Sequence, residues 1–217
     1  RDLHSFPHRR SAEPVRKPGV QNWLVGNVGK EGAALVAAQL TAAGLPVEAS
    51  PFARGTVACT GSEFCKLALT ETKSFARWLT NELEERLPAF EEQLKLHITG
   101  CPNSCGQHWI ADIGIEGKKI KQGGRMVDAY YFCVGGSVGQ FASIARPVGY
   151  RCSADTVPDA IERLLSGFQS RRDGNENLRQ FFQRHSSEEL RALLAGDFVA
   201  AVERDLSLGP VPHGVEG

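Results

Sequence analysis

The sequence predicts an α+β protein with a mixed β-sheet and helices on its outside. Residues 94–98 alternate between apolar and polar side chains, which is typical of a strand, and residues 110–116 and 128–134 resemble two more strands. Residues 71–87 and 157–168 instead carry apolar side chains three or four positions apart. That spacing predicts helices that pack one face against a core.

The composition is that of an ordinary globular protein. Hydrophobic residues make up 41% and charged residues 23% of the 217 residues, enough for one good core or two small domains. The formal net charge is zero and no apolar run approaches the length of a membrane span, so we expect neither nucleic acid nor a membrane as a partner. Arg9-Arg10 lacks the hydrophobic segment of a twin-arginine signal, and the cysteines are expected to be reduced. A cytoplasmic location is therefore predicted.

The N-terminal quarter is predicted to hold an arm and a small structural unit. Residues 1–18 contain three prolines and many charges, which indicates an extended, solvated arm or linker. Within residues 19–55, a short strand precedes an alanine- and leucine-rich helix at residues 30–43, which Gly44 ends. A second strand is expected to begin at Val47, so that this part forms a β-α-β unit.

Residues 56–170 are predicted to form the main domain. A short strand at residues 56–59 runs into a first cysteine-containing loop, and a helix follows that loop. The strand at residues 94–98 then leads directly to Cys101. A loop at the end of a strand is a common way to hold functional side chains on a rigid scaffold.

A glycine-rich run follows the strand at residues 128–134. Gly135 and Gly136 leave the strand in the run Val134-Gly-Gly-Ser. Such a loop can bind an anion with its backbone N–H groups, or it can be a plain turn, and both alternatives remain open. The basic hairpin tip before this strand is expected to be solvated, although it could dock an acidic electron donor.

Residues 171–217 are predicted to form a helical C-terminal extension with a flexible tail. A polar run marks its start, and a short apolar stripe after that run indicates one helix. Ser186 and Glu189 have the spacing of a capping box for a second helix, which is expected to stop at Gly196.

Four of the six cysteines form two tight pairs. Cys59 and Cys65 are separated by five residues, and Cys101 and Cys105 by three, with glycines close to both pairs. A [4Fe–4S] cluster needs four thiolates, and glycine lets the backbone approach the cluster and donate N–H groups to its sulfurs. The spacing therefore favours one iron–sulfur cluster held by all four.

Other interpretations of these cysteines remain open on spacing alone. Disulfides are disfavoured because the chain shows no secretory signal and is longer than a small stapled scaffold. Structural zinc is possible, but five residues between two ligands is wide for a zinc pair. Unrelated buried cysteines are the remaining alternative, and this is the expectation for Cys133 and Cys152, which lack paired spacing.

Together these motifs resemble the sirohaem- and [4Fe–4S]-dependent nitrite and sulfite reductases. The resemblance is carried by C-T-G-S-E-F-C and L-A-L-T-E-T-K within residues 59–73, by T-G-C-P-N-S-C-G-Q at 99–107 and by A-D-I-G at 111–114. It extends over residues 56–165 and implies that the main domain has the fold of the family's sirohaem domain. It also implies that residues 19–55 are part of a ferredoxin-like half-domain.

The resemblance further implies the cofactors and the residues that bind them. The four paired cysteines would hold the [4Fe–4S] cluster, and the sulfur of Cys105 would be shared with the iron of sirohaem, which makes Cys105 the catalytic ligand. Asn103 would order the loop beside the haem, and Gly135 and Gly136 would lie close to a sirohaem carboxylate. His97 and His108 flank the loop; for His97 we expect an exposed or hydrogen-bonded structural role.

The function implied is that of the C-terminal, cofactor-bearing part of an assimilatory nitrite or sulfite reductase. The run G-Q-x3-A-D-I-G after Cys105 favours the nitrite branch. The expected partners are nitrite or sulfite, an electron donor such as ferredoxin or a reductase subunit, and the missing N-terminal half or a partner chain. Two alternatives are an iron–sulfur electron-transfer module without sirohaem and a non-catalytic zinc-binding domain.

Overall fold

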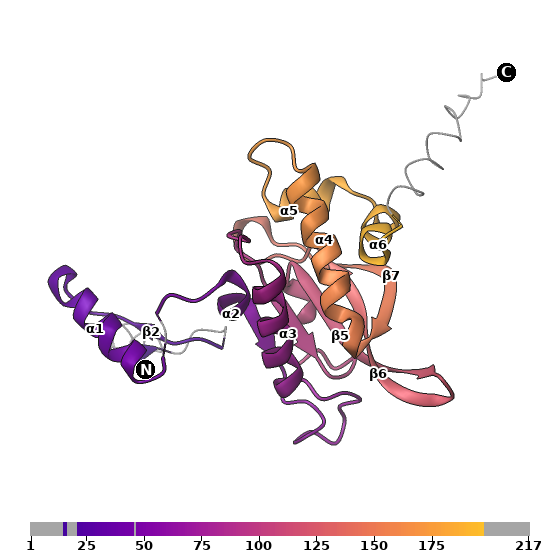
Figure 1. Ribbon diagram of the computed structural model, residues 1–217, viewed down its shortest axis with the longest axis horizontal. Helices are drawn as coiled ribbons and strands as arrows, with labels where there is room; N and C mark the ends of the chain where they lie inside the picture. Colours follow the sequence, from indigo (N-terminus) through magenta and orange to yellow (C-terminus); the bar gives the residue numbers. More distant parts are fainter. Residues whose placement is uncertain (1–14, 17–20, 46, 198–217) are drawn as a thin grey trace, which may run out of the picture.

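A computed structural model describes residues 15–16, 21–45 and 47–197. It contains a body of sheet and helices and a smaller N-terminal part to one side of it (Figure 1). The smaller part consists of a two-stranded antiparallel sheet, β1 (Val15–Arg16) with β2 (Leu24–Val25), and α1 (Lys30–Ala42). No residue of α1 is fully buried, and its half-buried residues are Gly32, Val36, Ala37 and Leu40.

The body is built on a mixed five-stranded sheet, which confirms the predicted fold class. Its strands follow the order β3-β4-β5-β6-β7. The first three run parallel to one another, and the last three form an antiparallel meander. The bounds are β3 (Thr56–Ala58), β4 (Leu96–Thr99), β5 (Ile113–Gln122), β6 (Arg125–Val134) and β7 (Arg146–Ser153).

Two long helices lie side by side on one face of the sheet, α3 (Lys73–Arg86) and α4 (Val157–Arg171) (Figure 1). Their apolar positions are the ones that the helical spacing predicts. Leu79, Leu83 and Ile161 are completely buried in the core between the helices and the strands. Burial of such side chains stabilises the fold by about 1.5–3 kcal/mol each.

The C-terminal extension packs as two short helices, α5 (Leu178–Arg184) and α6 (Ser187–Ala195). The predicted capping box of α6 is confirmed, because Ser186 and Glu189 exchange hydrogen bonds between side chain and backbone. Gly196 ends α6 with a left-handed φ of 86°, as predicted for a glycine cap. The tail beyond residue 197 lies outside the described residues, as does most of the predicted arm.

The strand expected at Val47 is wrong. The described residues after position 46 instead lead into a short helix, α2 (Pro51–Gly55), for which Ser50 is the N-cap and Pro51 the first residue. Phe52 of α2 is 1% exposed and stacks on Phe90 at a centroid distance of 5.3 Å. The main body therefore begins with α2, a few residues before the boundary predicted at residue 56.

Candidate functional site

The chain topology places Cys59 and Cys101 at the same end of the sheet. β3 and β4 are parallel neighbours, so their C-terminal ends lie together. Cys59 follows β3 directly, and its N–H donates to the carbonyl of Ile98 at 3.0 Å. Cys101 comes two residues after the end of β4. One cysteine of each predicted pair is thus held by the rigid end of a strand.

The loop that carries Cys65 is bound to the end of β4. Leu69 and Thr70 both donate their backbone N–H groups to the carbonyl of Gly100, at 2.7 and 3.3 Å. The Cys65 N–H donates to Gly61 at 2.9 Å, which closes a tight turn within the same loop. These bonds bring the first cysteine loop against the residue that immediately precedes Cys101.

The second cysteine loop contains two non-glycine residues in the left-handed region. Ser104 has a φ of 57° and Gln107 a φ of 56°. The Ser104 N–H donates to Cys101 at 3.3 Å, and the Gln107 N–H donates to Ser104 at 2.8 Å. Asn103 was expected to order this loop, but its side chain is exposed and these backbone bonds do the ordering. A role for Asn103 beside a haem stays a prediction.

The four thiols differ in exposure. Cys101 is 7% exposed, Cys59 and Cys65 are half-buried, and Cys105 is exposed. Cys59 Sγ accepts a hydrogen bond from the Gly100 N–H at 3.2 Å and lies 3.6 Å from the Thr72 hydroxyl. The Thr72 hydroxyl itself donates to the Cys59 carbonyl at 2.7 Å, so Gly100 supplies the N–H directed at this sulfur.

Glycines make room for the close approach of the two loops. A Cβ on Gly106 would lie 2.2 Å from the Ile98 carbonyl oxygen, and one on Gly100 would lie 2.9 Å from the Thr70 carbonyl oxygen. No side chain fits at either position without a backbone shift. The donor set, the N–H directed at a sulfur and these glycines together fit a [4Fe–4S] cluster, to which each cysteine would supply one thiolate.

A single metal ion needs a tighter arrangement of ligands than a cluster. The residues that the structure describes include no group of three or more His, Cys, Asp or Glu side chains that could hold one ion. A four-iron cube binds one thiolate on each iron, so its sulfurs lie farther apart than the ligands of one zinc ion.

Two buried histidines flank the second cysteine loop. His97 is 3% exposed, and its Nδ1 lies 3.0 Å from the Gln107 carbonyl oxygen. The hydrogen-bonded structural role predicted for His97 is confirmed, whereas the exposed alternative is wrong because the loop folds back over this face of β4. His108 is 1% exposed and lies between the Ser104 hydroxyl and Glu116. Burial lowers the pKa of both imidazoles below the ordinary value.

The polar partners of His108 were missed by the sequence analysis. Glu116 is 7% exposed although it carries a carboxylate, and it contacts both His108 and Lys118. The available signal was a glutamate at the end of an apolar strand, with a lysine two residues later on the same face. A buried carboxylate normally requires such partners.

The structure does not bring Gly135 and Gly136 to the cysteines. β6 ends beside the start of β5, so the two glycines lie at the opposite end of β4 from Cys101. Their N–H groups donate to the carbonyls of Asp112 and Ala111, at 2.9 and 2.8 Å. Both donors are thus occupied as in a plain turn, and a contact of this loop with a carboxylate of sirohaem stays a prediction.

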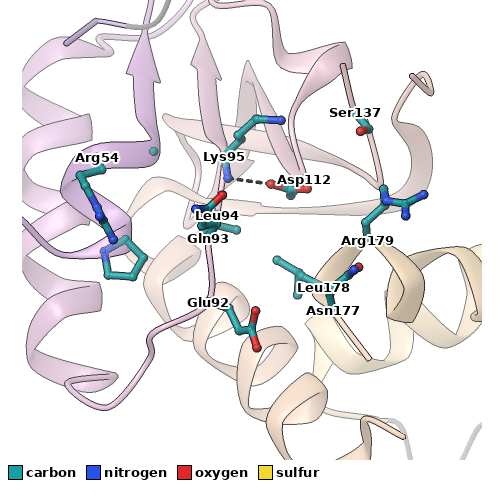
Figure 2. A pocket seen from close by; sticks show the side chains of 12 residues that line it. Arg54, Glu92, Gln93, Leu94, Lys95, Asp112, Ser137, Asn177, Leu178 and Arg179 are labelled. Atoms are coloured by element: carbon teal, nitrogen blue, oxygen red, sulfur yellow. Dashed lines mark hydrogen bonds between the residues drawn. The ribbon is translucent and has the colours of Figure 1, made fainter. Parts of the chain in front are cut away.

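A cleft of about 540 Å³ lies at the end of the sheet opposite to the cysteines (Figure 2). Its wall mixes cations such as Lys95 and Arg179 with the carboxylates of Glu92 and Asp112. The Lys95 N–H donates to Asp112 at 2.7 Å, and burial raises the pKa of this carboxyl despite that bond. The cleft contains none of the paired cysteines, so we place the functional site at the thiols and not at this hollow.

Comparisons with known proteins agree with the chemistry of the cysteine loops. Residues 49–199 match the family described as the nitrite and sulphite reductase 4Fe-4S domain. The assimilatory ferredoxin-dependent nitrite reductase of Haloferax mediterranei is 44% identical over 140 residues, which are 63% of this chain and 24% of that protein. A sulfite reductase [ferredoxin] of Mycolicibacterium paratuberculosis is 38% identical over 162 residues, 72% of this chain and 29% of that protein.

A solved structure is also similar. The NirA protein of Mycobacterium tuberculosis superposes with a TM-score of 0.75 at 32% identity, covering 82% of this chain and 34% of that one. The chain thus spans about a quarter to a third of the length of these relatives. No helix among the described residues is long and apolar enough to cross a membrane. The chain belongs to the nitrite and sulphite reductase 4Fe-4S domain family.

Proposed function

We propose that this chain is the cofactor-bearing C-terminal part of an assimilatory nitrite reductase, with sulfite as the alternative substrate. In this proposal Cys59, Cys65, Cys101 and Cys105 hold one [4Fe–4S] cluster. When bound, the cluster and sirohaem supply the redox chemistry that reduces nitrite to ammonia. The protein positions these groups and tunes them through ligands, hydrogen bonds and charge.

The proposal rests on one observation: the two cysteine loops meet at the same end of the sheet. β3 and β4 fix Cys59 and Cys101, and the carbonyl of Gly100 holds the loop of Cys65 in place. The Gly100 N–H is directed at Cys59 Sγ. A site built in this way positions its thiolates before the cluster arrives, which lowers the cost of ordering them.

Exposure supports Cys105 as the thiolate shared with sirohaem. Cys105 is exposed in the described chain, whereas Cys101 on the same loop is 7% exposed. Only an accessible sulfur could contact a second, large group in addition to the cluster. A thiolate shared in this way would let electrons pass from cluster to haem with almost no gap.

Relatives favour nitrite without excluding sulfite. The relative at 44% identity is named a nitrite reductase, and the one at 38% identity is named a sulfite reductase. Both names include ferredoxin, so we propose an acidic iron–sulfur protein of that class as the electron donor. The remaining length of such proteins, or a partner chain, would supply the cationic side chains that bind substrate and the sirohaem carboxylates.

The test is to measure the visible absorption of protein purified without oxygen from a host that makes sirohaem, with iron and acid-labile sulfide assayed on the same sample. We expect cluster absorbance with about four iron and four sulfide per chain, and sirohaem bands in addition when the rest of the enzyme is present. A colourless, iron-free protein, also after cluster reconstitution, would overturn the proposal.

The same spectrum separates the two other functions considered. Cluster absorbance that lacks sirohaem bands even in the complete enzyme would identify an electron-transfer module. A colourless protein that contains zinc and unfolds with a chelator would identify a structural metal domain. If both cofactors are found, rates of nitrite and sulfite reduction on the same preparation decide the substrate.

A further inference from the structure

A chain of polar contacts runs from the second cysteine loop to the protein surface. The Ser104 hydroxyl lies 2.8 Å from His108 Nδ1, and His108 Nε2 lies 3.4 Å from Glu116 Oε2. The other oxygen of Glu116 lies 2.5 Å from Lys118 Nζ. Ser104 is the neighbour of Cys105 in the sequence, and the Lys118 side chain is 38% exposed. Three contacts therefore connect the loop with solvent.

The turn of the cysteine loop does not require this chain. Ser104 is held in its left-handed conformation by backbone bonds to Cys101 and Gln107. Burying an imidazole and a carboxylate is unfavourable unless they pair, and apolar residues of similar size usually stabilise a fold equally well. Such a pair next to an expected redox centre points to a task other than stability.

The contacts assign the protons of His108. A carboxylate can only accept, so the 3.4 Å contact with Glu116 favours the tautomer with the proton on Nε2, and Nδ1 then accepts from the Ser104 hydroxyl. Burial lowers the pKa of His108, and the nearby His97 and Lys118 act in the same direction, whereas Glu116 opposes them. The ring is therefore neutral at pH 7.

We propose that His108 takes up one proton when one electron enters the neighbouring cluster site, so that the reduction potential of the site depends on pH. The inference rests on the proposed function, because the cysteines must hold the cluster. The electron comes from a low-potential iron–sulfur donor protein, and the proton comes from solvent by way of Lys118 and Glu116. One negative and one positive charge are added, so the net charge of the site is unchanged.

Protonation also changes what the ring donates. Both nitrogens of an imidazolium carry hydrogen, so Nδ1–H then donates to the Ser104 oxygen. The hydroxyl proton of Ser104 becomes free for another acceptor in the cysteine loop. The protonation state of His108 is thus communicated to the residue next to Cys105.

The groups around His108 allow such a response. β5 contributes Glu116 and Lys118, β4 contributes His97, and β6 contributes the Cys133 thiol, 3.6 Å from the His108 carbonyl. Burial raises the pKa of Cys133 to about 12, so this thiol stays neutral. Among the described groups that face His108, Glu116 is then the one negative charge. An added electron would be a second negative charge, and it would raise the proton affinity of the ring.

The experiment measures the midpoint potential of the cluster against pH in the cluster-loaded protein, with the wild type beside His108→Gln. Glutamine can still hydrogen-bond but does not titrate. In the wild type we expect the potential to rise by up to about 59 mV for each tenfold rise in proton concentration. His108 has one pKa when the cluster site is oxidised, which lies below about 6.5, and a higher one when the site is reduced. The slope should appear between these two pKa values. In His108→Gln the slope should disappear.

Two further variants make the result specific. His185→Gln replaces another buried histidine, which contacts Phe181 in the C-terminal helices, and should keep the wild-type slope. Glu116→Gln removes the negative partner while keeping its shape. Because His108 then binds a proton less readily, the slope should begin at lower pH. This variant also tests the inference if His108→Gln fails to fold.

The outcomes separate this inference from the proposed function. A loaded cluster whose potential does not change with pH would overturn the inference alone, as would a slope that persists unchanged in both His108→Gln and Glu116→Gln. A wild-type chain that cannot be loaded with a cluster, judged by iron, sulfide and absorbance, would overturn both.

Discussion

The backbone N–H of Gly100 donates a hydrogen bond to the sulfur of Cys59 across 3.2 Å, and the carbonyl of the same glycine accepts from Leu69 and Thr70. Gly100 follows β4, whereas Cys59 follows β3. One peptide segment therefore supports the first cysteine pair from two sides: it stabilises one sulfur and fixes the loop that carries Cys65. We expect the arrangement of the four thiols to depend on backbone geometry more than on the side chains around them.

Replacing Cys59 by alanine should abolish full cluster loading. The variant removes one of four thiolates, so iron and sulfide should fall well below about four of each per chain. Cys152→Ala is the matched control, because Cys152 is half-buried in β7 and belongs to neither pair. Iron, sulfide and visible absorbance on the two purified variants provide the measurement. Equal loading of both would contradict the assignment of Cys59 as a ligand.

Gly106→Ala should destabilise the protein and impair cluster loading together. The added methyl would lie 2.2 Å from the carbonyl oxygen of Ile98, so the second cysteine loop must move away from β4. Overpacking a rigid site costs about 1–3 kcal/mol, and a collision with backbone is expected to reach at least the upper end of that range. Urea unfolding measures the loss.

Gly29→Ala is the control for this substitution. A methyl at Gly29 would meet nothing within 4 Å, and the residue has a φ of −63°, which alanine adopts readily. Its stability should match the wild type or exceed it slightly, by less than about 1 kcal/mol. Equal stability of the two alanine variants would mean that the loop around Gly106 is more adaptable than its contacts indicate.

Sequence patterns predicted the elements whose determinants are local. The capping box of Ser186 and Glu189 and the glycine stop at Gly196 involve residues close together in the chain, so they were predicted correctly. The helices α3 and α4 followed from apolar side chains at helical spacing. The paired cysteines were likewise visible as spacing, before any fold was known.

Features that depend on distant contacts were missed. β7 was not predicted, because its burial follows no strict alternation and its register with β6 shifts between Tyr131 and Cys133. The occupied N–H groups of Gly135 and Gly136 could not be foreseen either, since their acceptors lie more than twenty residues earlier in the chain. Nothing local distinguishes an anion-binding glycine loop from a turn that packs on another segment.

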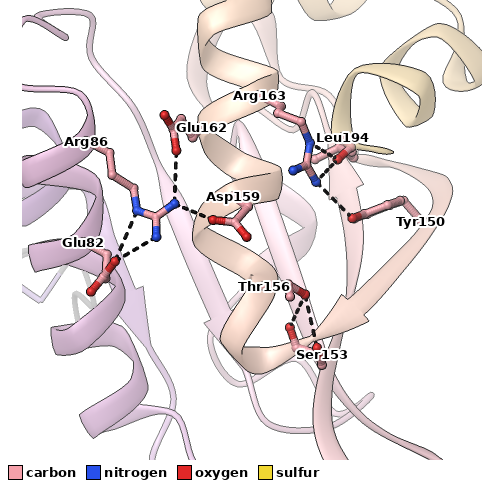
Figure 3. A network of polar contacts seen from close by, with 9 residues as sticks. All are labelled: Glu82, Arg86, Tyr150, Ser153, Thr156, Asp159, Glu162, Arg163 and Leu194. Atoms are coloured by element: carbon pink, nitrogen blue, oxygen red, sulfur yellow. Dashed lines mark hydrogen bonds and ion pairs between the residues drawn. The ribbon is translucent and has the colours of Figure 1, made fainter. Parts of the chain in front are cut away.

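Arg86 links the two long helices, and its removal should destabilise the body (Figure 3). Its guanidinium contacts Glu82 on its own helix and reaches Asp159 and Glu162 on α4, at 2.5 and 3.1 Å. All four side chains are about a third or more exposed, so solvent screening limits the effect. For Arg86→Met we expect a loss of about 1 kcal/mol in urea unfolding at low salt.

The salt dependence of this loss tests its electrostatic origin. At 1 M salt the screening length is about 3 Å, so the difference between Arg86→Met and the wild type should shrink. Arg77→Met provides the control, because Arg77 is an exposed arginine on the same helix. It should change stability little at either salt concentration. A loss for Arg86→Met that stays constant with salt would assign the effect to packing of its methylene groups.

Burial of His97 should make the protein less stable in mild acid. The pKa of His97 is lowered in the folded state, chiefly by burial, and none of the described residues offers a hydrogen-bond partner to its Nε2. As the pH falls below about 6.5, the unfolded chain binds a proton that the folded chain does not, so the free energy of unfolding decreases. This single group contributes a slope of up to about 1.4 kcal/mol per pH unit until the folded pKa is reached.

His97→Gln cannot titrate, and urea unfolding between pH 7 and 5 should therefore show a shallower decrease than in the wild type. Because His108 is also buried and contributes in the same direction, some dependence on pH should remain, and only the double variant with His108→Gln should remove most of it. An unchanged pH profile in His97→Gln would show that His97 is protonated in the folded protein as readily as in the unfolded chain.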